Sequence, residues 1–208
     1  MIAVADYGAG NLHSICTGLR RRGLDVRVTD DPRVLDAAAA LVVPGDGAFG
    51  PAMARLRARG FADSIPAYIR SGRPFLGVCL GMQLLFEESE EGGPHLGLGV
   101  LPGRVRRLPA TVKVPHMGWN RLRIERPSPL LAGVPSNAYV YFVHSYDCAP
   151  SDHALVAATA SYGREIAAVA GHGNVWATQF HPEKSGTVGA RILDNFARWT
   201  AGVGASGN

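Results

Sequence analysis

Apolar and polar residues alternate in blocks along the first half of the chain, and the blocks favour strands and helices in turn. The runs "MIAVAD", "AALVVPG" and "RPFLGVC" have no polar face, which is typical of buried parallel strands, and "DVRVT" predicts a further strand. After the first run, Leu12, Ile15, Cys16 and Leu19 repeat at the spacing of an amphipathic helix that ends at Gly23. This alternation predicts βα units and a parallel sheet.

The alternation of strands and helices continues to about residue 89, and the pattern of the middle of the chain is different. The glycine-rich segment "PGDGAFGPAM" leads into helical turns that reach Ser71, and "LGMQLLFEES" is expected to continue the fourth strand as a helix. From residue 97 to residue 162 the pattern changes to short alternating strands, "RVRRL", "RLRIE" and "AYVYFVHSY". Such alternation is typical of antiparallel or mixed sheets with one face exposed.

The last third returns to the main sheet. "IAAVAGHGNVWATQF" predicts a hairpin that turns at residues 171–174, and Val188, Ile192, Phe196 and Trp199 lie on one face of a final helix. We therefore expect an α/β fold with an open, mostly parallel twisted sheet flanked by helices and a smaller antiparallel or mixed extension. Because no linker interrupts the pattern, residues 1–201 are expected to form one domain and residues 202–208 a flexible tail.

Composition narrows the class of protein. The chain is 47% hydrophobic and 18% charged, as in ordinary soluble globules, and its amino terminus has no signal-peptide pattern, so we expect a cytoplasmic protein without membrane contact. The net charge is +4, and nearly all of the basic residues are arginines. The densest arginine clusters, at residues 20–22 and 104–107, are not interleaved with aromatic residues, which favours a solvated face or a patch for an acidic partner over a nucleic-acid surface. The three cysteines cannot form a disulfide framework, and the histidines show no metal-ligand spacing, so neither a metal nor a cofactor is expected.

Cys79 is the first candidate for chemistry. It stands between Gly77 and Gly81 where a buried strand is expected to turn sharply into a helix, which is the context of a nucleophile elbow. Such a turn needs small neighbours, and it places the sulfur near a helix amino terminus that favours a thiolate. A buried packing role remains the alternative, and it is the interpretation we give to Cys16 and Cys148.

A cysteine nucleophile requires a base, and the base requires an orienting acceptor. "QFHPEKSG" supplies His181 and Glu183, two residues apart at the end of a strand, although an isolated His-Pro-Glu is also common in loops. Attack on an amide also requires donors for the oxyanion. One is the N–H of Leu80, and the second is expected from the loop of Gly45, Asp46 and Gly47.

Together these motifs resemble the class I (triad) glutamine amidotransferases. "DYGAGNL", "PGDGAFGPAM", "VPHMGWN" and "YFVHSY" are similar, within that class, to the glutaminase subunits of imidazole glycerol phosphate synthases in histidine biosynthesis. The resemblance covers about residues 1–200. It implies a catalytic triad of Cys79, His181 and Glu183, hydrolysis of glutamine through a γ-glutamyl thioester, and passage of ammonia to a (βα)8-barrel cyclase subunit in a heterodimer.

The resemblance also implies roles for further residues. Glutamine would be bound by Gln83, Glu91, Ser145 and Tyr146, and the cyclase would be contacted by Asn11, Trp119, Asn120 and Lys184. Asp46 departs from the family, which usually has valine there, and we expect its carboxylate to point away from the oxyanion, toward solvent or the partner. A backbone peptide of this loop is thought to reorient in the family when the active complex forms. The lone subunit is therefore expected to be nearly silent.

Three alternatives differ in observable ways. Another class I amidotransferase, which would serve anthranilate, GMP or pyridoxal phosphate synthesis, is disfavoured by "PHMGWN" and "YGAGNL". A stand-alone cysteine peptidase should act without a partner. A binding module without chemistry is disfavoured by the intact Cys79, His181 and Glu183.

Overall fold

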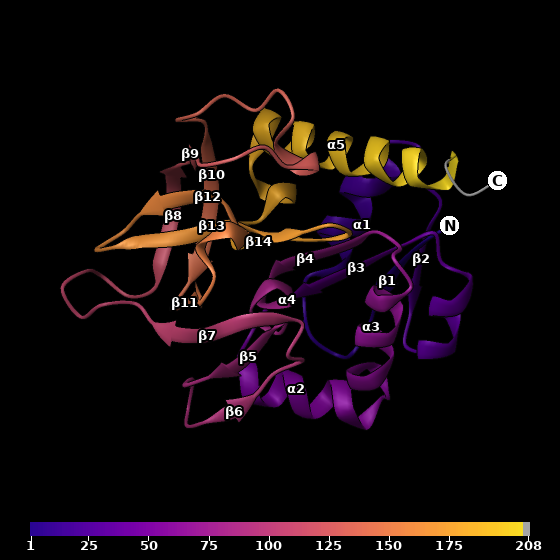
Figure 1. Ribbon diagram of the computed structural model, residues 1–208, viewed down its shortest axis with the longest axis horizontal. Helices are drawn as coiled ribbons and strands as arrows, with labels where there is room; N and C mark the ends of the chain where they lie inside the picture. The colour runs from indigo at the N-terminus through magenta and orange to yellow at the C-terminus, as the bar shows by residue number, and fades with distance from the viewer. Residues whose placement is uncertain (206–208) are drawn as a thin grey trace.

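An eight-stranded sheet crosses the molecule in the computed structural model, which describes residues 1–205 (Figure 1). Its first five strands are parallel, and the last three continue it in antiparallel pairs. In spatial order the strands are β2 (Val26–Thr29), β1 (Ile2–Ala5), β3 (Ala40–Gly45), β4 (Phe75–Cys79), β14 (Val175–Thr178), β13 (Glu165–His172), β12 (Val156–Ser161) and β9 (Arg123–Ile124). The expected parallel sheet, and the hairpin of β13 and β14, are confirmed.

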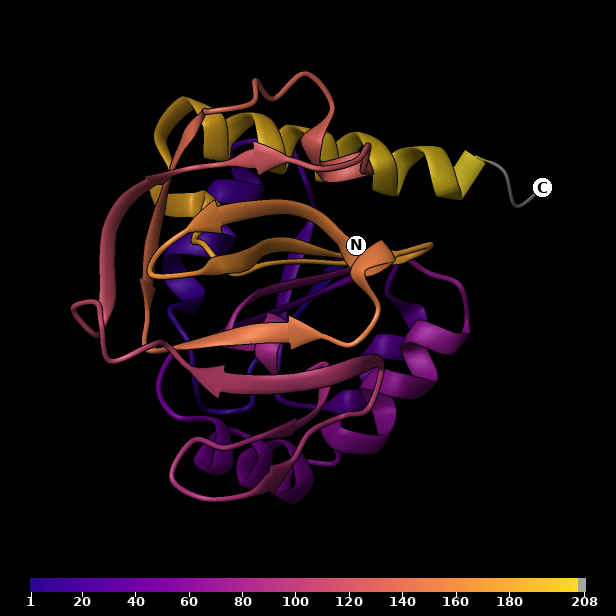
Figure 2. The same cartoon turned by 60° about the vertical axis from the view of Figure 1, so that its left-hand side comes forward.

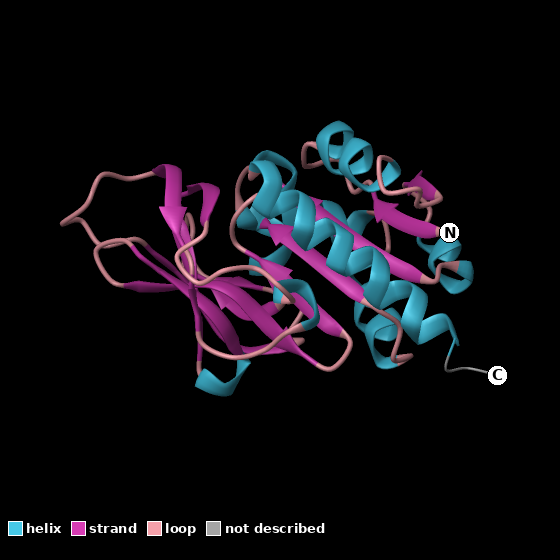
Figure 3. Cartoon of the chain, turned by 90° about the horizontal axis from the view of Figure 1, so that it is seen from above, coloured by secondary structure: helices cyan, strands magenta, loops and turns pink. Residues whose placement is uncertain are grey.

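Helices cover both faces of the parallel part (Figure 3). Helices α1 (Leu12–Arg20) and α5 (Gly186–Ala205) pack on one face, and α2 (Phe49–Ala58) and α3 (Phe61–Arg70) pack on the other. Alternate residues of β1 point into the two separate cores, since Ile2 and Val4 face α1 while Ala3 and Ala5 face α2 and α3. Burial of both faces explains the uninterrupted apolar runs.

Two smaller sheets form the extension beside the main sheet. One contains β11 (Tyr146–Pro150), β7 (Leu101–Arg107), β5 (Phe86–Ser89) and β6 (His95–Leu96), and the other pairs β10 (Tyr139–His144) with β8 (His116–Arg121). Strands β7 and β11 run antiparallel and side by side (Figure 2). The expected strand "AYVYFVHSY" is broken at Ser145, so that its halves enter different sheets. The α/β fold with a mixed extension is therefore as expected.

The helix expected over "LGMQLLFEES" was wrong in its length. Helix α4 spans only Leu80–Gln83, and the chain then enters β5, which pairs with β7 and β6. Leu84, Leu85 and Phe86 are all buried, so they offer no polar face to a longer surface helix. The early end of α4 brings β5, and with it the smaller sheet, next to the carboxyl end of β4.

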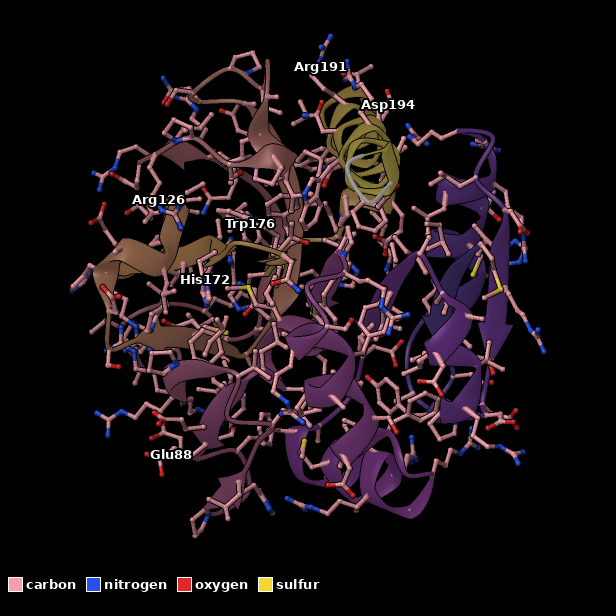
Figure 4. All side chains as sticks on the ribbon, turned by 45° about the vertical axis from the view of Figure 1, so that its right-hand side comes forward. Glu88, Arg126, His172, Trp176, Arg191 and Asp194 are labelled. Atoms are coloured by element: carbon pink, nitrogen blue, oxygen red, sulfur yellow. The ribbon has the colours of Figure 1, made fainter. Side chains whose placement is uncertain are left out.

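The remaining turns complete the framework. Among the described residues, four short 3-10 helices span Pro32–Ala37 (η1), Pro129–Leu131 (η2), His153–Leu155 (η3) and Pro182–Lys184 (η4). Near the antiparallel edge, Arg126 covers the indole of Trp176, with its guanidinium carbon 5.0 Å from the ring centroid (Figure 4). Helix α5 continues to Ala205, so the first part of the expected tail is helical, and residues 206–208 lie outside the described residues. Within residues 1–205, no helix is both long and apolar enough to cross a bilayer.

Candidate active site

The elbow at Cys79 stands at the carboxyl end of the central strand β4. Its backbone has φ +55° and ψ −110°, a conformation that side chains rarely adopt and that the surrounding packing must enforce. A Cβ on Gly77 would lie 2.7 Å from the carbonyl oxygen of Gly81, and a Cβ on Gly81 would lie 1.8 Å from the carbonyl oxygen of Val43. Glycine on both sides is therefore a steric requirement of the turn, as the sequence pattern predicts.

The turn after β14 places His181 and Glu183 beside this elbow. His181 precedes η4, and its Nδ1–H donates to Glu183 Oε1 over 2.9 Å, which directs Nε2 of the ring away from the carboxylate. Both side chains are buried. Ser185 holds the turn, because its hydroxyl donates to the carbonyl of His181 and accepts from the N–H of Tyr141.

The charge state of His181 follows from these contacts. Burial lowers its pKa, but hydrogen bonds to Cys79 and to Glu183 raise it further than burial lowers it, to about 10. At neutral pH the imidazole therefore carries a proton beside the sulfur. Such an arrangement can accept a proton from a thiol, hold it, and deliver it to a leaving amine.

The glycine-rich loop after β3 lies against the same elbow. Gly45 pairs with Cys79 across β3 and β4, and a Cβ on Gly45 would lie 2.4 Å from the hydroxyl of Tyr7. Gly47 has φ +89°, a backbone conformation that favours glycine. The structure thus places the loop of Gly45, Asp46 and Gly47 next to Leu80.

The carboxylate of Asp46 is anchored to a neighbouring loop. Its Oδ1 accepts a hydrogen bond of 2.9 Å from the N–H of Gly10, which follows β1. The loops approach closely, since a Cβ on Gly10 would lie 3.1 Å from the Cα of Gly45. Asp46 is exposed at the mouth of the site, but its contact is with the backbone of Gly10, an anchor that the sequence pattern does not predict.

A cavity of about 450 Å³ opens above the sulfur. Most of the site residues predicted from the sequence line this cavity. The exceptions are Gly45, Glu183, Trp119 and Asn120. Its walls are formed by Asn11, Asp46, Gly47, Cys79, Leu80, Gln83, Glu91, Pro115, Val143, His144, Ser145, Tyr146, His181 and Lys184. The volume suits a ligand of amino-acid size with room to spare.

Two polar side chains of this cavity are held by backbone groups. Glu91 Oε2 accepts a hydrogen bond of 2.8 Å from the N–H of Phe49, the first residue of α2. The amide nitrogen of Gln83 donates to the carbonyl of Tyr146 over 2.9 Å and to Oε1 of Gln179 over 3.2 Å. Gln83 is therefore a buried, oriented group, rather than a solvated residue of a helix surface.

A pair of buried histidines, His116 and the cavity-lining His144, is absent from the sequence-based prediction of the site. Nδ1–H of His144 donates to the carbonyl of Tyr146, so Nε2 must accept from Nδ1–H of His116, and Nε2 of His116 accepts from the amide of Asn120. Burial lowers the pKa of each histidine to about 4, so both are neutral at pH 7. The only sequence signal was their place in "VPHMGWN" and "YFVHSY", since neither residue shows a catalytic spacing.

Two of the four expected interface residues lie on the rim of the cavity, and the other two lie on β8. Asn11 and Lys184 are exposed on its rim. Trp119 projects from β8 with 55% of its surface exposed and packs edge-on against Tyr141 of β10. Asn120 alternates to the other face of β8, where it also donates to the carbonyl of Ser161.

Comparison with known proteins agrees with the fold. The family model described as "Glutamine amidotransferase class-I" matches residues 3–199. A solved structure described as "Structure of PurLQS from Thermotoga maritima" aligns with a TM-score of 0.77 and 19% identity, over 95% of this chain and 97% of that chain. At that identity the likeness concerns the fold alone.

Curated relatives are much more similar in sequence. "Imidazole glycerol phosphate synthase subunit HisH" of Syntrophotalea carbinolica is 54% identical, over 94% of this chain and 98% of the relative. The protein of the same name from Synechococcus sp. (strain JA-3-3Ab) is 53% identical, over 96% of this chain and 94% of the relative. The resemblance predicted from the motifs is thereby confirmed. The chain belongs to the class-I glutamine amidotransferase family and, within it, to the family of imidazole glycerol phosphate synthase subunits HisH.

Proposed function

We propose that this chain is the glutaminase subunit of an imidazole glycerol phosphate synthase, which hydrolyses glutamine and supplies the ammonia for histidine biosynthesis. The observation that carries the proposal is the alignment of Cys79, His181 and Glu183 beneath one cavity at the carboxyl ends of β4 and β14. The reaction takes place in the cytoplasm, and one domain of residues 1–201 carries it out.

The first half of the reaction forms a thioester. The sulfur of Cys79 attacks the side-chain amide carbon of glutamine, and the electron pair of the carbonyl moves to its oxygen. The N–H of Leu80 and a second N–H from the loop of Gly45, Asp46 and Gly47 stabilise this oxyanion. His181 then gives its proton to the nitrogen, the C–N bond breaks, and ammonia leaves.

The second half releases glutamate. A water molecule gives a proton to His181 and attacks the thioester carbon, after which the C–S bond breaks and its electron pair returns to Cys79. Glu183 keeps the imidazole oriented through both steps and stabilises its charged form, because it accepts the Nδ1–H hydrogen bond. The enzyme returns to its starting state without a cofactor.

Substrate recognition follows from the chemistry of the cavity walls. Glutamine carries an ammonium group at one end, and the carboxylate of Glu91 is a complementary charge in the cavity wall. Gln83 and the backbone of Ser145 and Tyr146 bind the remainder of the substrate. Hydrogen bonds to backbone groups hold the side chains of Glu91, Gln83 and His144 in the cavity wall, so glutamine enters a largely pre-formed site.

The partner binds at the mouth of this cavity. Met117, Trp119 and Tyr139 are 63%, 55% and 47% exposed and lie on the paired strands β8 and β10, whose Val143 also lines the cavity. Exposed aromatic and apolar side chains of this kind mark protein interfaces. Asn11 and Lys184 extend the contact along the rim. We assign this surface to the (βα)8-barrel cyclase, which uses the ammonia to make imidazole glycerol phosphate and AICAR in a heterodimer.

A reconstitution experiment tests the proposed function. We expect a mixture of this chain, the cyclase and phosphoribulosyl-formimino-AICAR-phosphate to consume one glutamine for each imidazole glycerol phosphate formed. Glutamine turnover should rise about 100- to 1000-fold over the lone chain, the effect of completing one oxyanion donor. Equal turnover with and without the cyclase and its ligand would contradict the expected reorientation of the loop of Gly45, Asp46 and Gly47. Failure of glutamine to support synthesis where ammonium succeeds would exclude the subunit assignment.

Replacement of Trp119 by alanine is expected to weaken binding of the cyclase. A buried tryptophan at the centre of an interface typically contributes about 2 kcal/mol or more, so the Kd should rise at least about 30-fold. Isothermal titration calorimetry measures this change. The matched control is Leu96→Ala on β6, which removes a still more exposed apolar side chain, at 71%, away from β8 and β10 (Figure 1). An equal loss in both variants would place the interface elsewhere.

A further inference from the structure

Gln179 is the first residue of the stretch "QFHPEKSG" and lies next to the reacting sulfur, but the sequence pattern assigns it no role. It follows β14 directly and stands two residues before His181. Its backbone N–H donates a hydrogen bond to the carbonyl of Ala168 on β13. The side chain is fully buried. Its amide nitrogen donates to the sulfur of Cys79 over 3.7 Å. A buried, neutral donor therefore faces the nucleophile from the strand next to β4.

The orientation of this amide is determined by its other partners. Oε1 of Gln179 accepts from the amide nitrogen of Gln83 over 3.2 Å and from the thiol of Cys148 over 3.9 Å. Gln83 cannot turn its amide without loss, because the same nitrogen donates to the carbonyl of Tyr146, which can only accept. Because Oε1 of Gln179 accepts these two hydrogen bonds, the side-chain NH2 group must be the end of the amide that faces Cys79.

A second group at the sulfur has the opposite preference. The carbonyl oxygen of Val143 lies 3.8 Å from the sulfur and can accept a hydrogen bond from the neutral thiol. A carbonyl stabilises the neutral thiol, because it accepts a hydrogen bond from the S–H group. An N–H stabilises the thiolate, because it donates a hydrogen bond to the negative sulfur. Gln179 therefore opposes Val143 and favours the form of Cys79 that attacks.

We propose that Gln179 is a further catalytic residue of the glutaminase, whose side-chain N–H holds the sulfur of Cys79 and stabilises its negative charge. The proposal rests on the proposed function for its role in turnover, whereas the contact with the sulfur does not depend on the substrate. The sulfur is anionic before attack and again when the C–S bond of the thioester breaks and its electron pair returns. Gln179 stabilises the sulfur at both of these stages, whereas the oxyanion donors act between them.

Replacement of Gln179 by methionine, which is similar in size and cannot donate, tests the role. We expect the pH midpoint of Cys79 alkylation by iodoacetamide to rise by about one unit and kcat for glutamine to fall about tenfold, with little change in KM. Cys79 influences the pKa values of His181, Tyr7 and Cys148, and the variant keeps all three of these residues. Alkylation is followed on the Cys79 peptide by mass spectrometry.

Asn195→Leu is the matched control for lost stability. Asn195 is a buried amide of α5 that donates to the carbonyls of Leu130 and Ala132, remote from the sulfur, so this variant should lower the melting temperature without moving the alkylation midpoint. An unchanged midpoint in folded Gln179→Met would overturn the proposal. A shifted midpoint in a chain that does not hydrolyse glutamine would instead sustain the contact and reject the proposed function.

Nuclear magnetic resonance provides a measurement that needs no folded Gln179 variant. The chain contains two glutamines, Gln83 and Gln179, so glutamine labelled with ¹⁵N in its side chain gives two amide signals. We expect the Gln179 signal to titrate with the same midpoint as Cys79 alkylation, and to lose that titration in Cys79→Ala. A Gln179 amide signal that does not respond to the sulfur would refute the contact even if Gln179→Met failed to fold.

Discussion

Cys79→Ala is expected to abolish synthesis from glutamine and to leave synthesis from ammonium intact in the complex with the cyclase. The variant lacks the atom that forms the thioester, so glutamine-dependent turnover should fall about 10⁴-fold or more. Ammonium enters the cyclase reaction after this step and needs no sulfur. Alanine fills a buried position that is already small, so the elbow loses its nucleophile without a large cavity. Formation of imidazole glycerol phosphate from each nitrogen source measures both routes.

Cys16→Ala serves as the control for this variant. Cys16 is a buried thiol of α1 that packs in the core, and its replacement should leave both routes at wild-type rates. Loss of the ammonium route in Cys79→Ala would mean that the elbow supports the complex rather than the chemistry. Survival of the glutamine route would mean that another group attacks the amide, and it would contradict the triad.

The parallel half of the fold could be predicted because its strands are buried on both faces. A run such as that of β3 has no polar residue, and its helices carry one apolar stripe each. The absence of polar residues also explains why the predicted helix was wrong from Leu84 to Phe86. A buried apolar run of this length is compatible with either a helix or a strand. Pairing with β7 decides the outcome, and β7 begins more than a dozen residues later.

Some residues of the candidate site could be predicted from the sequence, and others could not. Cys79, His181 and Glu183 carry reactive groups at informative spacings, and the glycines around Cys79 reveal the turn from the sequence alone. Gln179 has no charge and no periodic partner, and its contacts come from β4, from α4 and from β11. Only the folded sheet brings these together. The anchor between Asp46 and Gly10 joins two loops in the same way, across 36 residues of sequence.

Gly81→Ala is expected to lower glutamine turnover about 100-fold or more through a single methyl group. The added Cβ would lie 1.8 Å from the carbonyl oxygen of Val43, a backbone atom of β3, so either α4 or β3 must move. The φ of Gly81 does not lie in the left-handed region, so the effect is steric and not conformational. A displacement of the sulfur by about 1 Å costs on the order of 100-fold in rate.

A stability measurement separates this displacement from simple unfolding. Overpacking at Gly81 should cost about 1–3 kcal/mol, which for a chain of this length lowers the melting temperature by about 2–4 °C per kcal/mol. Gly23→Ala provides a comparable loss without a clash, because Gly23 has φ +72° and nothing within 4 Å of an added Cβ. We expect similar melting temperatures in the two variants but full glutaminase activity only in Gly23→Ala. If both variants retained activity, the position of the sulfur could not depend on the contact between α4 and β3.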